Sequence, residues 1–504
     1  MAWVWLFAAI KLVFHLVTSS KLGYFRDEFY YIACGRHLAW GYVDHAPGIA
    51  LLARLDQQLL GTSLLALRLP VALAGAATVL LGGLIARALG GGRSAQALAA
   101  LGALVAPIYL GTDHLFTMNS FEVLFWALAA LLLVRILRGD QEGLWPWLGV
   151  AIGLGIMTKH SMAFFAGALF LGLALSPVRA RLGRRGPWIA AAIALGIFLP
   201  NLGWQFAHHF PTLEFLRNAE GHKNVKLAPA EFLSALVLVA HPLNAPVWLA
   251  GVLYLLFGRS ARAVRALGWA FVLLLGFFML RSAKIYYFTP ILTPMLAAGG
   301  VALERVCARI RAAWIVPAYG ALLLLTAIPL VPLAVPVFPV EQQMAYINAF
   351  QKRGIGAPRM ERHKVAMLPQ VLADQTGWRE MVDSVGAVYR ALPATDRAHC
   401  TLFATNYGQA GALDFFGARY GLPPARCGHN SYWMWGPGNP ADWQTAVLVG
   451  QDSADVAKTY REVRIVARTH SPYGMSYEDD QPIIVARGLK RDVREVWADV
   501  RFYI

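Results

Sequence analysis

The chain has 504 residues, of which 57% are hydrophobic and only 15% are charged, and its formal net charge is +16. Soluble globular proteins usually carry about 25% charged residues, so this composition excludes an ordinary soluble enzyme and indicates that much of the chain lies in lipid. The positive charge does not indicate nucleic-acid binding, because the arginines are spread over short connections between apolar segments, which is typical of membrane proteins.

Apolar segments along the chain predict a polytopic α-helical membrane protein with about eleven spans, since each span needs about 20 apolar residues. The predicted spans are 3–19, 64–89, 95–112, 119–138, 146–158, 160–176, 187–206, 232–257, 266–281, 285–303 and 312–334. The first segment has no basic region and no small-residue cleavage site, so we expect a retained span rather than a cleaved signal peptide.

Basic residues predict how these spans are oriented. Every second short connection is rich in arginine, and such connections face the cytoplasm. These arginines are Arg87, Arg93, Arg135, Arg138, Arg179, Arg181, Arg184, Arg185, Arg259, Arg262, Arg265, Arg305, Arg309 and Arg311. The alternate connections hold the acids, histidines and lysines, so we expect them to face outward. With an odd number of spans, the N-terminus is cytoplasmic and residues 335–504 lie outside.

The first outward connection, 20–63, is dense in charge. Asp27, Glu28, Arg36, Asp44 and His45 follow one another closely in a chain that is otherwise poor in charge. Charged side chains kept beside lipid are costly and are usually functional. The alternative for Asp27 and Glu28 is a solvated helix start, where acidic residues are common.

Asp113 follows the span at 95–112, at its outer end. If the bundle brings the first and third spans together, Asp27 and Asp113 share one outward cavity. Two carboxylates can then divide the work, one taking a proton and the other orienting a substrate or a cation. The alternative for Asp113 is an ordinary loop carboxylate.

Cationic side chains form a third feature. Lys159 interrupts an apolar stretch, and Arg281 and Lys284 stand at the outer ends of two later spans, near Tyr287. Lysine and arginine in such places are suited to hold an anionic group such as a phosphate. The alternative for Arg281 and Lys284 is that their charged ends reach toward lipid headgroups.

From about residue 335 the composition becomes mixed. Helical stretches alternate with short β-type runs at 400–404, 446–450, 463–467 and 483–486, which predicts a soluble α/β domain with its own core. Cys400 and Cys427 both fall in this outward domain, where an oxidising compartment permits a disulfide; the alternative is two buried free thiols. We therefore divide the chain into a transmembrane domain, 1–334, and an α/β domain, 335–504.

Two segments carry a resemblance to a known family: Arg26-Asp27-Glu28-Phe29-Tyr30-Tyr31 and Tyr42-Val43-Asp44-His45-Ala46-Pro47-Gly48. They resemble the bacterial relatives of the protein mannosyltransferases and of the aminoarabinose transferase that acts on lipid A. The segments 158–161, 284–287, 406–411 and 428–433 also resemble segments of that family. The resemblance spans the whole chain and implies a GT-C fold with a C-terminal periplasmic domain, in a bacterial inner-membrane glycosyltransferase that uses a polyprenyl-phosphate sugar as donor.

The resemblance also implies roles for single residues. Asp27 would be the catalytic carboxylate that activates the acceptor, with Glu28 beside it; Asp113 remains a candidate second acid from its position in the chain alone. Residues implied to contact the donor phosphate or its lipid are His45, Lys159, Lys284 and Tyr287; Arg281 is a further candidate from its charge and position alone. Asp44 stands where the lipid A enzymes have an acid that contacts a metal, so a divalent metal at Asp44 stays open; no other cofactor is implied.

The expected reaction is an inverting transfer, in which an acceptor hydroxyl attacks the anomeric carbon and phosphate leaves. The sugar stays open among hexose, pentose and uronic acid, and the acceptor among lipid A, another glycolipid, a polysaccharide and a protein. A transporter or flippase of a lipid-linked saccharide is the alternative. Against it, the polar residues gather at the outer membrane boundary and no internal repeat is evident.

Overall fold

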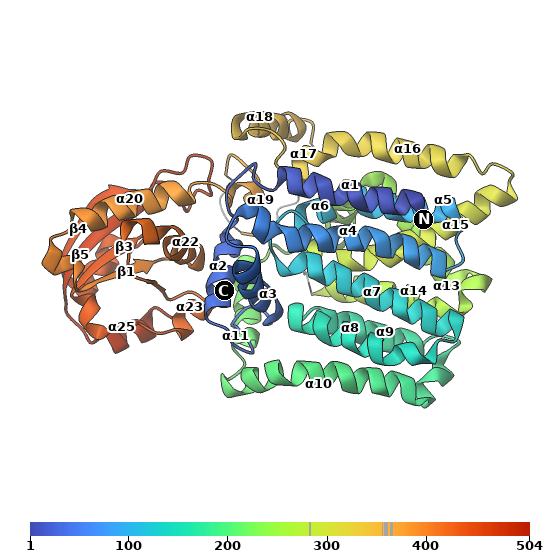
Figure 1. Ribbon diagram of the computed structural model, residues 1–504, viewed down its shortest axis with the longest axis horizontal. Helices are drawn as coiled ribbons and strands as arrows, with labels where there is room; N and C mark the ends of the chain where they lie inside the picture. Colours follow the sequence, from blue (N-terminus) through green and yellow to red (C-terminus); the bar gives the residue numbers. More distant parts are fainter. Residues whose placement is uncertain (282–283, 355, 357–360, 363–365) are drawn as a thin grey trace.

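The fold is that of a computed structural model of the chain, which describes residues 1–281, 284–354, 356, 361–362 and 366–504. A long helical bundle and a smaller domain with a β-sheet lie end to end (Figure 1). The N-terminus lies at the far end of the bundle from the sheet domain.

Apolar helices of different lengths build the bundle. They are α1 (Ala2–Thr18), α4 (Leu64–Ala88), α5 (Arg93–Val105), α6 (Pro107–Thr112), α7 (Met118–Gly139), α8 (Trp145–Thr158), α9 (Met162–Ala174), α10 (Arg185–Ala207), α12 (Pro229–Val239), α13 (Ala245–Phe257), α14 (Arg265–Leu280), α15 (Leu292–Arg309), α16 (Ile315–Ala327) and α17 (Val331–Ala334). Three short helices lie at the end that faces the sheet domain: α2 (Arg26–Arg36), α3 (Gly48–Leu59) and α11 (Pro211–Asn218).

The predicted count of about eleven spans is not confirmed. Among the described residues, six helices are long and apolar enough to cross a membrane, or seven if the pair Pro229–Val239 and Pro242–Phe257, bent by 99°, crosses as one. The six are Leu64–Ala88, Met118–Gly139, Arg185–Ala207, Arg259–Leu280, Ile285–Arg309 and Ile315–Ala334.

The other predicted spans fold as shorter helices: the first is α1, with 17 residues, and extended residues separate the helices of others. Ala106 is extended before Pro107 and separates α5 from α6, as expected for a residue that precedes proline. Lys159 is extended and separates α8 from α9, which have 14 and 13 residues.

The C-terminal domain follows α18 (Val340–Gln351) and α19 (Gln370–Ala373). Its five-stranded sheet has the order β2-β1-β3-β5-β4. The strands are β1 (Cys400–Ala404), β2 (Ala425–Cys427), β3 (Thr445–Val449), β4 (Tyr460–Arg468) and β5 (Pro482–Leu489). Strand β1 pairs in parallel with β2 and β3, whereas β5 runs antiparallel to β3 and β4.

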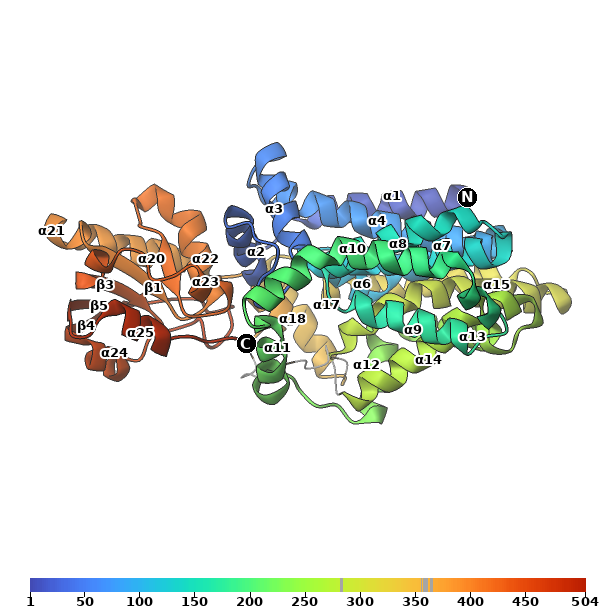
Figure 2. The same cartoon turned by 90° about the horizontal axis from the view of Figure 1, so that it is seen from below.

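Helices cover both faces of this sheet, as Figure 2 shows. The helices α20 (Trp378–Ala391), α22 (Tyr407–Phe416) and α23 (Ser431–Met434) lie on one face, and α24 (Ser453–Thr459) and α25 (Val493–Asp499) on the other; α21 (Ala394–Arg397) precedes β1. Alternate residues of each strand enter the two cores, Leu402 with α20 and α22, and Phe403 with α25. The predicted fold class, a helical membrane protein with a C-terminal α/β domain, is confirmed; the division at residue 335 stays a prediction.

Of the two alternatives for Cys400 and Cys427, the structure has the second, because both are buried free thiols. Cys400 begins β1, whereas Cys427 pairs with Ala404 at the other end of that strand. With a rise of about 3.3 Å per residue, the two lie farther apart than the roughly 4.4–6.8 Å between the Cα atoms of a disulfide.

Candidate active site

A cavity of about 610 Å³ lies between the helical bundle and the C-terminal domain. Its polar lining gathers side chains from α2, α7, α22 and several connections: Arg26, Asp27, Asp44, His45, Asn119, Lys159, Glu220, Lys223, Arg281, Lys284, Glu361, Asp374 and Tyr407. The rest of the lining is largely apolar and includes Ile108, Phe164, Phe277, Phe278, Leu330 and Leu333. A cavity with these two kinds of wall can hold a lipid chain and a polar headgroup together.

Asp27 and Glu28 point in different directions, because consecutive helical residues are about 100° apart around the helix axis. Helix α2 begins at Arg26, so Glu28 takes the third helical position, and its carboxylate accepts a bond of 2.8 Å from the Phe25 backbone N–H. Glu28 also accepts from Arg68, with Nε at 2.8 Å from Oε1. Glu28 is 0% exposed and does not line the cavity, which corrects the expectation that it stands beside Asp27 in the site.

Asp27, in contrast, faces the cavity, and its side chain is 30% exposed. The Tyr407 hydroxyl donates to its Oδ1 over 2.8 Å, and Arg26 Nε lies 3.8 Å from the same oxygen. Oδ2 of Asp27 has no hydrogen-bond partner within the described part of the chain. One oxygen is therefore held by the protein, and the other is available to a ligand.

Arg26 connects Asp27 to the C-terminal domain. Its guanidinium donates to the hydroxyls of Tyr407 and Tyr477, both over 2.9 Å. Burial raises the pKa of Tyr407 well above its ordinary value, against the opposing effect of Arg26. Tyr407 therefore remains a neutral hydroxyl that can donate to Asp27.

Asp44 lines the cavity beside His45. Tyr30 donates to Asp44 Oδ1 over 2.7 Å, and burial raises the pKa of Asp44. His45 Nδ1 lies 2.8 Å from the carbonyl of Ala46, and its buried Nε2 has no partner among the described residues. Within that part of the chain no group of three or more His, Cys, Asp or Glu side chains could hold a metal ion.

Asp113 lies outside the cavity. It is buried and forms an ion pair of 2.9 Å with Lys11 of α1. The first and third predicted spans do meet there, but Lys11 neutralises Asp113 inside the bundle. The structure therefore does not bring Asp113 to Asp27, which corrects the expectation of a shared cavity.

Lys159 reaches the cavity from the break between α8 and α9. Its Nζ donates to Glu122 over 2.6 Å and to Asn119 over 2.8 Å. The ammonium also lies over the rings of Tyr287 and Tyr286, 4.5 and 4.9 Å from their centroids, within the range of cation–π attraction. Lys159 and Tyr287, predicted separately, are thus neighbours.

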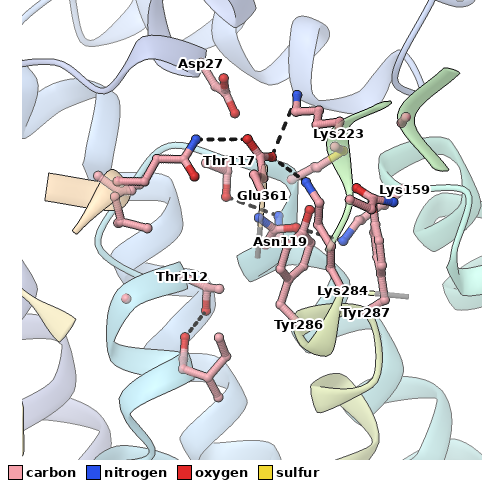
Figure 3. Close-up of a pocket in the computed structure, with 18 of the residues that line it drawn as sticks. Asp27, Thr112, Thr117, Asn119, Lys159, Lys223, Lys284, Tyr286, Tyr287 and Glu361 are labelled. Carbon is pink, nitrogen blue, oxygen red and sulfur yellow. Dashed lines mark hydrogen bonds and ion pairs between the residues drawn. The ribbon is translucent and has the colours of Figure 1, made fainter. Parts of the chain in front are cut away.

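A second cationic group surrounds Glu361, which projects into the cavity (Figure 3). Lys284 Nζ lies 2.5 Å and Lys223 Nζ 3.8 Å from Glu361 Oε1. Burial would raise the pKa of Glu361, but Lys223 and Lys284 lower it below its ordinary value, so the carboxylate is charged. Arg281 lines the cavity too and pairs with Glu220 at 3.3 Å.

Sequence reasoning did not assign Tyr407, Lys223 or Glu361 to this site. Tyr407 belongs to a segment that carries the family resemblance, which was the signal available for it. Lys223 lies among other charged residues in a connection predicted to face outward, whereas no sequence motif marks Glu361. Their placement depends on how distant segments pack together.

Known proteins resemble this chain in sequence and in fold. Residues 44–204 match the model of the dolichyl-phosphate-mannose-protein mannosyltransferase family. The lipid A galacturonosyltransferase RgtD of Rhizobium johnstonii is 26% identical over 387 residues, covering 73% of this chain and 78% of that protein. The crystal structure of ArnT from Cupriavidus metallidurans bound to undecaprenyl phosphate has a TM-score of 0.65 at 17% identity, covering 96% of this chain and 98% of that one. The same protein in the apo state gives a TM-score of 0.63, at the same identity and coverage.

Proposed function

We propose that this membrane protein, which has the GT-C fold and is similar to glycosyltransferases that use lipid-linked sugars, is an inverting enzyme. It would move a sugar from a polyprenyl-phosphate donor to an acceptor at the periplasmic face of the inner membrane. The observation that carries the proposal is the cavity itself. In it, Asp27, which has one carboxylate oxygen without a partner among the described residues, faces the same space as Lys223 and Lys284 (Figure 3).

The reaction follows from this arrangement. Oδ2 of Asp27 takes the proton of an acceptor hydroxyl while the hydroxyl oxygen attacks the anomeric carbon. The bond from that carbon to the phosphate oxygen breaks on the opposite face, and the phosphate leaves with the bonding electron pair. Cations of the cavity stabilise the negative charge that gathers on the phosphate. Attack opposite to the leaving group inverts the anomeric configuration.

Two cationic groups could receive the donor phosphate. Lys284 and Lys223 already hold a carboxylate, that of Glu361, which supports their ability to hold an anion. Lys159 is neutralised by Glu122 and braced by Tyr287, so it supplies less free charge. We therefore assign the phosphate to the Lys284 and Lys223 side, with Lys159, Tyr287 and Arg281 bordering it.

The distribution of arginines supports the proposed orientation. Arg138 and Arg305, from two different predicted cytoplasmic connections, both donate to backbone carbonyls at the end of α4, to Ala88 and Leu89. Arginines of several connections thus meet at one end of the bundle, which is the pattern of a cytoplasmic face. The N-terminus would then be cytoplasmic and the sheet domain periplasmic.

Direct assay tests the proposal. Purified protein in lipid nanodiscs is incubated with polyprenyl-phosphate hexoses, pentoses and uronic acids, each with lipid A, another glycolipid, a polysaccharide or a protein as acceptor. We expect at least one donor to yield free polyprenyl phosphate and a glycosylated acceptor with inverted anomeric configuration by NMR. Movement of lipid-linked sugar across vesicle membranes, without transfer from any donor, would support the transporter hypothesis instead.

A further inference from the structure

The C-terminal domain packs closely onto helix α2, which carries Asp27. Two glycines of α22 permit this contact. A Cβ atom at Gly408 would lie 2.3 Å from Arg26 Cγ, and one at Gly411 would lie 2.7 Å from Phe29 Cβ. Phe29 also enters the core on the α22 face of the sheet. Because the two helices share a packed core, α22 holds its first residues at a fixed place beside Asp27.

Tyr407 is the first residue of α22, and the start of this helix is firmly held. The Asn406 side chain caps it, accepting from the backbone N–H groups of Gly408 and Gln409 at 2.9 and 3.1 Å. The other end of that amide donates to Glu478 over 2.9 Å. The cap therefore fixes the direction in which the Tyr407 side chain leaves the helix.

The hydrogen bonds of the Tyr407 hydroxyl have a defined direction. An arginine can only donate, so Arg26 uses a lone pair of the Tyr407 oxygen. The single hydroxyl proton is then free to point to Asp27 Oδ1, at 2.8 Å. This leaves Oδ2, which has no partner among the described residues, available to a ligand in the cavity that Asp27 lines.

A second tyrosine donates a hydrogen bond to another aspartate of the cavity, Asp44. Tyr30 stacks on Tyr407 with ring centroids 4.5 Å apart, and it donates to Asp44. Ser431 of the C-terminal domain lies 2.8 Å from the Tyr30 hydroxyl. The two stacked tyrosines therefore connect Asp27 and Asp44 to the C-terminal domain.

We propose that Tyr407 is a positioning residue through which the C-terminal domain completes the active site: its hydroxyl holds Asp27 so that Oδ2 faces the acceptor hydroxyl. This inference rests on the proposed function, because it takes Asp27 as the base. The C-terminal domain would then contribute to the chemical step itself, whether or not it also selects the acceptor. A freely rotating carboxylate would spend part of its time turned away, and a misplacement of about 1 Å can cost about 100-fold in rate.

The test compares kcat and KM of the full-length wild type with those of Tyr407→Phe, Tyr432→Phe and Asp27→Asn, using a donor and acceptor that the wild type accepts. Tyr407→Phe keeps the ring stack and removes only the hydroxyl. Tyr432→Phe is the matched control, since its buried hydroxyl donates to Asp414, away from the cavity. We expect Tyr407→Phe to lower kcat by about 10- to 100-fold with donor KM within twofold, and Tyr432→Phe to match the wild type.

Two results would overturn the inference while leaving the proposed function intact: wild-type kcat in Tyr407→Phe, or an equal loss in Tyr432→Phe. Full transfer in Asp27→Asn would instead show that Asp27 is not the base, which would overturn the mechanism given under the proposed function and this inference with it. A loss of activity caused by poor folding is distinguished from a loss of positioning by introducing Tyr407→Phe into the Asp27→Glu variant. In that variant the longer side chain already moves the carboxylate away from the Tyr407 hydroxyl. Removing the hydroxyl should then cost less than twofold, whereas a folding defect would persist in that background.

Discussion

Glu28 and Asp27 are adjacent in the sequence, yet they belong to two regions with opposite electrostatic designs. Glu28 and Arg68 form a closed pair in which the guanidinium also donates to the carbonyls of Ser19 and Gly23 at 2.6 and 3.0 Å. Asp27 lies in the cavity, with one oxygen held by Tyr407 and the other unpartnered in the described part of the chain. The difference teaches that a charge is available for chemistry only where the protein leaves part of its hydrogen-bonding capacity unused.

The largest expected effect is on the cavity side of this comparison. Replacing Asp27 by Asn keeps the shape of the side chain but removes the base, so the transfer rate should fall by about 10²- to 10⁴-fold. Binding of undecaprenyl phosphate and the melting temperature should stay close to those of the wild type. Single-turnover transfer, ligand binding and thermal unfolding in nanodiscs measure the three quantities. Transfer at the wild-type rate would mean that Asp27 is not the base.

The corresponding replacement of an acid by its amide at Glu28 should lower stability instead of the transfer rate. Glu28→Gln leaves the buried Arg68 without its counter-ion, and breaking such a pair costs about 3–5 kcal/mol. We expect a large drop in melting temperature, while the fraction that remains folded binds undecaprenyl phosphate normally. Asp27→Asn serves as the control of equal size. A Glu28→Gln protein that is stable but inactive would restore Glu28 to the catalytic role suggested by the sequence.

Much of this comparison was predictable from sequence, but not the separation of the two acids. Charge density in an apolar chain identified the Asp27 segment, Lys159 and Lys284, and all three line the cavity. The divergence of Glu28 depends on helix α2 beginning at Arg26 and on Arg68, 40 residues away. A local pattern does not contain such long-range partners.

The remaining differences have the same origin. Asp113 looked like a functional candidate in the sequence because nothing there shows that Lys11, on another helix, is its ion-pair partner. The register of β1 and β2 decides that Cys400 and Cys427 are apart. The α/β domain itself was predictable from alternating short patterns, whereas the docking of α22 on α2, which brings Tyr407 to Asp27, was not.

Glu478 differs from Glu28 in its partners. Its buried carboxyl group is hydrogen-bonded to side-chain amides, whereas that of Glu28 is bonded to a cation. It accepts from Gln409 at 2.7 Å and from Asn406 at 2.9 Å, and burial raises its pKa from 4.5 to about 7. The folded state therefore holds a proton that the unfolded state loses between these pKa values, so stability falls as pH rises. The loss from pH 5 to pH 8 is about 2.5 kcal/mol. Thermal unfolding of the wild type should show this fall in stability with pH, and the neutral Glu478→Gln variant should show a smaller one. An equal fall in the variant would mean that another group causes the pH dependence.

The smallest expected effect tests whether a ligand can replace a charged side chain in the cavity, which is not possible for the buried Glu28. Glu361 occupies Lys284 and Lys223, so a donor phosphate must displace or share these cations. Glu361→Gln removes the competing charge, and we expect undecaprenyl phosphate to bind about tenfold more tightly, equivalent to about 1.4 kcal/mol. Glu214→Gln is the control, since Glu214 pairs with Arg501 outside the cavity lining. Weaker binding of undecaprenyl phosphate in Glu361→Gln alone would mean that this carboxylate holds the phosphate site in place, much as Glu28 holds Arg68. Glu361 would then be a structural charge, and the contrast with Glu28 would not include it.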